Sequence, residues 1–260
     1  MTATTLPSST QPGAPATARP ASRRVTDAAT RMQHWLMALS FTGAYLTAEG
    51  ERWRLVHVTL GYTLAGLLVF RVLWGLFGPR QARLSVLGRK LQGLPGWLQS
   101  LTSLSSPDAL APVWRQGQNL LMALAVALIL TLVVPLSLSG YAIWDEWGGD
   151  WLEELHEFFS NALLVVVLGH IGLIVLLSAL RRKNQALPML TGRVAGAGPD
   201  LAKRNHGLLA ALLLACVLGF WGWQWRQAPN SSQSVQASVE ALFQADNGLA
   251  QSSGHDSDDD

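Results

Sequence analysis

Several kinds of residue are scarce in this 260-residue chain, and each shortage excludes a class of protein. The single cysteine, Cys216, excludes a disulfide framework, and the lack of a C-x-x-C-H segment excludes covalent attachment of a c-type haem. Only 14% of the residues are charged and 49% are hydrophobic, which is not the composition of a soluble domain. No segment has the two-residue alternation that a membrane β-barrel requires.

Long apolar runs are what the chain does contain. A membrane-spanning helix needs about 20 apolar residues. Five segments qualify, and these are 32–48, 56–77, 119–143, 155–180 and 207–225. The first is the weakest, because its end, "TGAYLTAEG", is less apolar. We therefore predict an all-α integral membrane protein with a four-helix bundle and a fifth, C-terminal transmembrane helix.

The charged residues are divided unequally between the two sides of the membrane. If the N-terminus is cytoplasmic, the inner segments contain fifteen Lys/Arg and three Asp/Glu, and the outer segments contain three Lys/Arg and fourteen Asp/Glu. Basic segments remain on the cytoplasmic side of bacterial membranes. The sequence therefore predicts a multi-pass protein of the bacterial cytoplasmic membrane, with a cytoplasmic N-terminus and a periplasmic C-terminus.

Composition divides the chain into four parts. Residues 1–24 are rich in Pro, Ala, Ser and Thr and are predicted to be a disordered cytoplasmic tail. Residues 25–195 form the four-helix domain, 196–226 add the extra helix, and 227–260 are an acidic periplasmic tail. Inside the second part, the loop 78–114 is expected either to lie flat at the inner interface or to be only partly ordered.

Four of the six histidines lie in the apolar segments at two depths. His156 and His170 are 14 residues apart. In a helix this spacing turns through 1400°, about 40° short of four full turns, and rises about 21 Å. Both rings therefore leave one helix face. His34 begins the first span at the inner surface, and His57 begins the second at the outer surface. Depth pairs His34 with His170 on the inner side and His57 with His156 on the outer side.

Two imidazoles in an apolar bundle favour haem over other groups. Zinc needs four ligands, and no further Cys, Asp or Glu lies at these depths. Haem takes four ligands from its own macrocycle, so two axial histidines suffice. We therefore expect two b haems, one at each histidine pair. A transporter that relays protons through its histidines is the alternative without haem.

Two further residues of the second span share the face of His57. Arg71 follows His57 by 14 residues and is predicted to pair with a propionate of the inner haem. The alternative is that Arg71 extends to the inner headgroups. Gly61, four residues after His57, would let the macrocycle approach the backbone, although helix packing uses glycine too.

Three stretches, "RVTDAATRMQHWLMALSFTGAYLTAE", "HVTLGYTLAGLLVFRVLWGLFGP" and "LHEFFSNALLVVVLGHIGLIVLLSALRRKNQALPMLTGR", together resemble the prokaryotic cytochrome b561 family. That family includes the b-type cytochrome subunits of nickel–iron hydrogenases. The resemblance covers about residues 25–193 and includes T-R-x-x-H-W, H-x-x-x-G-Y and F-R-x-x-W-G. It implies a four-helix bundle with two b haems, and its residues fall on this chain as follows: axial ligands at His34, His57, His156 and His170, and the family arginine at Arg71.

The chain departs from the family pattern at the start of the third span. Many members have G-H-N-P there, whereas this chain has "GQNL", with Gln118 and Leu120. The missing histidine is not an axial ligand. Its absence therefore leaves the haem sites intact and puts in doubt only a quinone or propionate contact.

The resemblance implies a diheme cytochrome that transfers electrons across the membrane between the quinone pool and a periplasmic redox partner such as a c-type cytochrome. An acidic outer surface favours a basic partner, although topology alone also leaves such loops acidic. Its residues are Asp145, Glu146, Asp150, Glu153, Glu154 and Glu157. The alternative is a superoxide:quinone oxidoreductase, whose anionic substrate favours a basic mouth. Whether the chain is itself an enzyme stays open. The expected partners are lipid, quinone and the redox protein, with no nucleic acid, and a homo-oligomer is left open.

Overall fold

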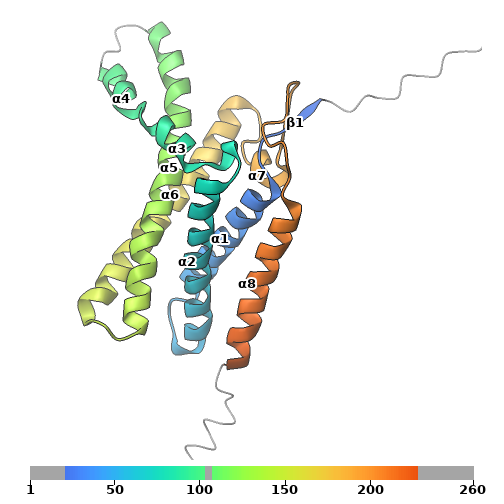
Figure 1. Cartoon of the computed structure of the whole chain (residues 1–260). Coiled ribbons are helices and arrows are strands. Elements are labelled where there is room, and N and C mark those ends of the chain that lie inside the picture. The colour runs from blue at the N-terminus through green and yellow to red at the C-terminus, as the bar shows by residue number, and fades with distance from the viewer. Residues whose placement is uncertain (1–20, 103–106, 228–260) are drawn as a thin grey trace, which may run out of the picture.

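The computed structural model describes residues 21–102 and 107–227 (Figure 1). Its elements are β1 (Ser22–Arg24), α1 (Ala28–Leu46), the 3-10 turn η1 (Glu51–Trp53), α2 (Arg54–Phe77), the 3-10 turn η2 (Arg80–Ala82), α3 (Leu84–Leu91), α4 (Leu94–Thr102), α5 (Pro107–Trp144), α6 (Asp150–Arg181), α7 (Leu187–Thr191), β2 (Arg193–Ala195) and α8 (Gly207–Gln227). Nearly all of the two predicted tails, 1–20 and 228–260, lies outside the described residues. The described chain is therefore mainly helical, as the apolar runs predicted.

The long helices of the described chain are α1, α2, α5, α6 and α8, and they run side by side (Figure 1). Helices α1 and α2 pack as one pair and α5 and α6 as another; α2 contacts α5, and α8 packs on α1. In the described part of the chain, α2, α5 from Val113 onward, α6 and α8 are long and apolar enough to cross a membrane. Helix α1 is not among them, so the prediction of a span at 32–48 was wrong. Polar residues such as Gln33 and Ser40, which are 3% and 0% exposed, lower its apolar character. Their side chains face protein and not the surface.

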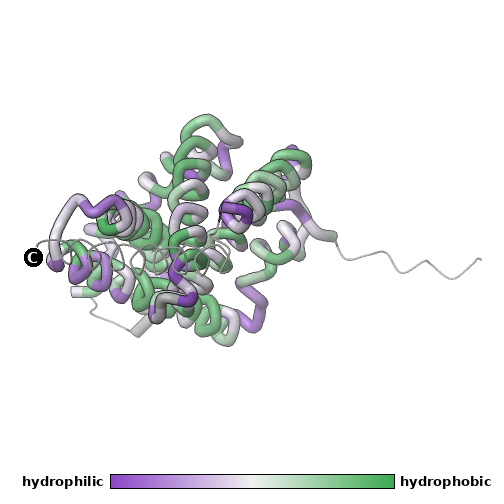
Figure 2. The backbone as a smooth tube through the Cα atoms, turned by 90° about the horizontal axis from the view of Figure 1, so that it is seen from below, coloured by the Kyte–Doolittle hydropathy of each residue, from purple (hydrophilic) through white to green (hydrophobic). Residues whose placement is uncertain are grey.

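The outer faces of these helices are apolar. Figure 2 shows hydrophobic residues along the helices and hydrophilic ones mainly in the connections. Side chains more than half exposed include Leu39, Val69, Val165, Val175 and Leu208. Soluble monomers rarely expose contiguous apolar surface on this scale. The surface is therefore suited to lipid.

Helix α8 is joined to the bundle by packing and by a hydrogen bond. Val217 belongs to the same buried cluster as Leu67, Val133 and Leu163. The indole Nε1 of Trp221 donates to Thr63 Oγ1 at 2.8 Å. Such bonds between side chains help helices associate in lipid, where water does not compete. The helix outside the family-like region is thus part of one body with it.

The end of the bundle predicted to be cytoplasmic carries a small sheet. Strand β1 pairs antiparallel with β2, and Arg23 is opposite Val194. Just after β1, Asp27 caps α1 by accepting the Thr30 N–H at 2.8 Å. Residues 22–24, placed by composition at the end of the disordered tail, are therefore ordered. Their partner strand lies far along the chain, and composition does not reveal such backbone pairing.

The loop 78–114 also contains more structure than a partly ordered loop. It forms η2, α3 and α4, and α5 begins at Pro107 and not near residue 119. The indole of Trp97 in α4 donates to the Val113 carbonyl at 3.0 Å, and a Cβ on Gly117 would lie 2.5 Å from the Trp97 ring. Helix α4 therefore docks on an extension of α5 that the apolar run alone did not indicate.

Candidate functional site

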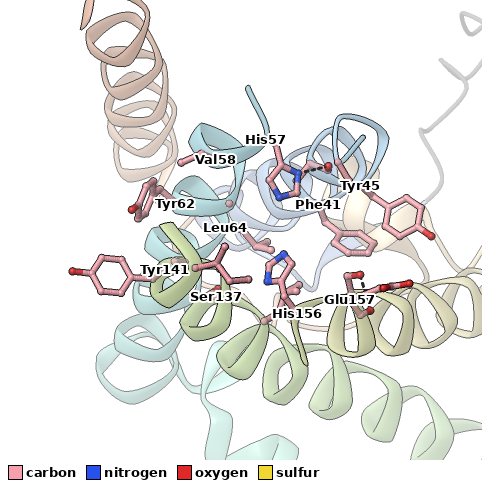
Figure 3. Close-up of a pocket in the computed structure, with 18 of the residues that line it drawn as sticks. Phe41, Tyr45, His57, Val58, Tyr62, Leu64, Ser137, Tyr141, His156 and Glu157 are labelled. Carbon is pink, nitrogen blue, oxygen red and sulfur yellow. Dashed lines mark hydrogen bonds between the residues drawn. The ribbon is translucent and has the colours of Figure 1, made fainter. Parts of the chain in front are cut away.

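Two histidines from different helices face each other between the helix pairs (Figure 3). His57 lies in the first turn of α2 and His156 in the second turn of α6. Their ring centroids are 6.1 Å apart, with the ring planes at 70°. A metal ion midway between two imidazoles, about 2.0 Å from one nitrogen of each, would hold the ring centroids roughly 6 Å apart. The observed separation therefore suits coordination of one ion by both rings.

Each of the two histidines donates a hydrogen bond from Nδ1, which leaves its other ring nitrogen, Nε2, available. His57 Nδ1 lies 2.8 Å from the Ala44 carbonyl oxygen, which can only accept, so the ring proton is on Nδ1. His156 Nδ1 lies 3.1 Å from Ser139 Oγ, whose own hydroxyl donates to the Leu136 carbonyl at 3.1 Å. Ser139 therefore accepts from His156. A neutral imidazole held in this way presents an Nε2 lone pair to a metal.

The histidines border a cavity of about 1010 Å³. Cofactor sites typically have volumes of about 300–1,000 Å³, and this cavity lies at the upper end of that range. The cavity opens to the surface of the described bundle and is large enough to admit an occupant. A Cβ on Gly61, which also lines the cavity, would meet nothing within 4 Å. The space and the donor set therefore fit a large, mainly apolar ring such as haem.

A second glycine positions the imidazole of His156. A Cβ on Gly140 in α5 would lie 2.9 Å from His156 Cε1. The missing side chain lets the ring lie across the α5 backbone. Ser139 and Gly140 together form the only "SG" of the third apolar run, and this pair is the signal that sequence reasoning missed.

Polar groups gather at the rim of the cavity. Three carboxylates line it, those of Glu49, Glu153 and Glu157, so the expectation that no further carboxylate lies at the depth of this histidine pair was wrong. Within the described residues, however, no group of three or more His, Cys, Asp or Glu is placed to hold a metal ion. Ser137 Oγ also lines it, is buried, and has no hydrogen-bond partner among the described residues. Leaving a buried hydroxyl unpaired costs roughly 1–3 kcal/mol, so a ligand oxygen would be favoured there. The rim is thus acidic, with one free donor within.

The other predicted pair is His34 in α1 and His170 in α6. These imidazoles are near enough for one to influence the other electrostatically, whereas those of His57 and His156 are in ring contact. His170 Nδ1 is buried and makes no hydrogen bond within the described ranges. The ring of His34 lies edge-on to Trp35, with centroids 5.5 Å apart. This pair has fewer orienting contacts than His57 and His156, but it carries an unsatisfied ring nitrogen that a ligand would engage.

Arg71 lies at a smaller cavity at the same end of the bundle. That cavity measures about 300 Å³ and is also lined by Thr30, Lys90 and Asn119. Neither His34 nor His170 lines it, and Arg71 NH1 donates to the Ala82 carbonyl at 3.0 Å. The predicted pairing of Arg71 with a propionate therefore stays a prediction.

The residue that departs from G-H-N-P has a structural partner. Gln118 is only 4% exposed. Its Oε1 accepts from Arg181 Nε at 2.9 Å and from Arg181 NH2. This contact ties α5 to α6 at the end of the bundle predicted to be cytoplasmic. Gln118 is thus used for helix packing, and it leaves the two histidine pairs untouched.

Comparison with known families identifies one match. The model described as prokaryotic cytochrome b561 matches residues 25–192, which is more than half of the chain. The matched region contains both histidine pairs and ends before α8. Comparison with curated proteins and with solved structures finds no match.

Proposed function

Because the chain belongs to the prokaryotic cytochrome b561 family, we propose that it is a diheme b-type cytochrome carrying electrons between the membrane quinone pool and a periplasmic redox protein. Family membership by itself indicates b-type electron transfer in a membrane. The observation that carries the finer proposal is the opposed pair His57 and His156. The Nδ1 atom of His57 lies 2.8 Å from the Ala44 carbonyl oxygen, and that of His156 lies 3.1 Å from Ser139 Oγ. Both Nε2 atoms would thereby be free to hold the iron of one haem.

The two histidine pairs are assigned to two haems at different depths in the membrane. His57 and His156 would hold the outer haem, and His34 and His170 the inner one. Bound haem supplies reversible one-electron chemistry at iron. The two histidines of α6 lie about 21 Å apart along the helix, which covers most of a hydrocarbon layer of about 30 Å. Basic residues near α3, including Arg83, Arg89 and Lys90, support a cytoplasmic placement of the inner pair.

The acidic rim supports a basic protein as the outer partner. Glu49, Glu153 and Glu157 line the outer cavity itself. Opposite charge steers a basic protein toward this mouth and speeds its association. The same carboxylates repel an anion such as superoxide. We therefore place transfer to a basic c-type cytochrome ahead of superoxide oxidation.

Purified protein tests this function in two steps. A pyridine haemochrome assay should give two b haems per chain, and quinol should reduce both in vesicles. A soluble basic c-type cytochrome should then reoxidise them. A colourless protein in haem-replete cells would contradict the proposal. So would quinone-linked superoxide consumption faster than cytochrome reduction.

Neutralising the rim tests the charge of the partner. In the triple variant Glu49→Gln, Glu153→Gln, Glu157→Gln, the second-order rate with the basic cytochrome should fall about tenfold at low ionic strength. The difference should vanish in high salt, because screening removes steering. Stopped-flow spectroscopy measures both rates. A small neutral oxidant should react equally fast with both proteins, and a salt-independent loss would indicate damage to the site instead.

Ser139→Ala tests the hydrogen bond that orients His156. Losing the partner of a metal-bound histidine typically weakens binding about 10–100-fold. Apomyoglobin competes for haem and can extract it. We expect it to remove the outer haem from this variant at lower concentrations than from the unmodified protein, and to remove the inner haem equally from both. Ser160→Ala is the matched control, because Ser160 lines the same cavity but donates only to the Glu157 carbonyl. Equal haem retention in both variants would contradict this role of Ser139.

A further inference from the structure

Three aromatic rings lead from the outer cavity to the protein surface. Tyr62 of α2 and Tyr141 of α5 both line the cavity, with ring centroids 6.5 Å apart. Figure 3 shows them on the side of the cavity opposite Tyr45. The next ring is that of Trp147, 5.3 Å from Tyr141 and 69% exposed. Tyr62 is partly buried, Tyr141 is 42% exposed and Trp147 is more exposed still, so exposure rises along this line of three rings from the cavity to the surface.

The turn after α5 holds Trp147 against Tyr141. The Trp147 N–H donates to the Ala142 carbonyl at 3.0 Å, and the Glu146 N–H donates to the Ile143 carbonyl at 3.2 Å. Glu146, the residue before Trp147, has φ 56°, in the left-handed region where helix ends usually have glycine. That conformation costs a residue with a side chain roughly 1–2 kcal/mol. The chain tolerates this cost and folds the indole back over the tyrosine.

Acidic residues flank the exposed indole in the sequence. Asp145 and Glu146 precede Trp147, and Asp150 and Glu153 follow in the first turn of α6. An exposed tryptophan within a field of one charge sign is a typical energetic centre for a protein–protein contact. Charge complementarity identifies the occupant as a basic soluble redox protein.

We propose that Tyr62, Tyr141 and Trp147 form an aromatic bridge that couples the outer haem site to the docked partner. This inference rests on the proposed function. Electron tunnelling weakens steeply with each through-space gap, and neighbouring aromatic rings keep those gaps short. The rings pass one electron without being oxidised themselves. The group held by His57 and His156 loses that electron, the ferric iron of the partner gains it, and no bond or proton changes place.

Stopped-flow measurements at saturating cytochrome separate coupling from docking. With Trp147→Ala, the limiting rate of electron transfer should fall several-fold, while Trp147→Phe should keep most of it. Calorimetric titration of the oxidised protein with the oxidised cytochrome measures affinity when no electron moves. Trp151→Ala is the matched control, because Trp151 is 61% exposed on the same acidic surface but lies outside the line of rings. Its limiting rate should equal that of the unmodified protein.

The middle ring of the line, that of Tyr141, is tested separately. The limiting rate should survive Tyr141→Phe, which keeps the ring, and fall with Tyr141→Leu at unchanged haem content. An unchanged limiting rate in Trp147→Ala, or an equal loss in Trp151→Ala, would overturn the bridge and leave the proposed function standing. If the unmodified protein fails to reduce the cytochrome at all, the proposed function fails instead.

Discussion

Replacing either His57 or His156 with alanine should remove one haem of the two, and the same one in both variants. The two rings are 6.1 Å apart on opposite sides of one cavity, so they would share a single iron. A b haem is not attached covalently, and axial coordination is a large part of what holds it. The pyridine haemochrome assay should show two haems per chain falling to one. The double variant should lose no more, because its second substitution acts on an empty site.

A redox titration identifies which haem is lost. The same component of the titration should disappear in both single variants. His206→Ala is the control: the His206 ring packs against Trp74 with centroids 5.0 Å apart, away from both pairs, and this variant should retain two haems. If His57→Ala and His156→Ala removed different haems, or if the double variant lost both, the pairing by depth would be wrong.

Gly61→Leu should eliminate the outer haem without unfolding the protein. A Cβ at Gly61 meets nothing within 4 Å, so the leucine side chain would extend into the cavity beside His57 and occupy the space required by the macrocycle. Leucine also raises helix propensity by roughly 0.8 kcal/mol relative to glycine. We therefore expect haem content to fall by about half, while helix content by circular dichroism stays unchanged.

Gly66→Leu separates cavity filling from a general effect of leucine. Gly66 lies five residues further along α2, has nothing within 4 Å of its Cβ position, and is exposed on the outside of the helix. This variant should retain both haems. A full haem complement with an unaltered spectrum in Gly61→Leu would mean that the cavity does not hold the macrocycle.

The sequence by itself determined the helical membrane architecture and predicted a depth for each histidine. The second and fourth runs, 56–77 and 155–180, correspond to α2 (Arg54–Phe77) and α6 (Asp150–Arg181). Their ends were predictable because burying a backbone in lipid requires an uninterrupted apolar helix of sufficient length. The regular 1.5 Å rise per residue then converts spacing within one helix into depth.

Only the tertiary structure decided how the site is held and what covers α1. The hydrogen bonds from His57 to Ala44 and from His156 to Ser139 join separate helices, and so does the contact of Gly140 with His156. Spacing along one helix carries no information about which atoms of a neighbouring helix lie opposite. Likewise, the run 32–48 was predicted as a span, but α1 is not apolar enough to be one, and its polar residues Gln33 and Ser40 are buried against protein. Burial between helices depends on packing among distant segments, which no local pattern records.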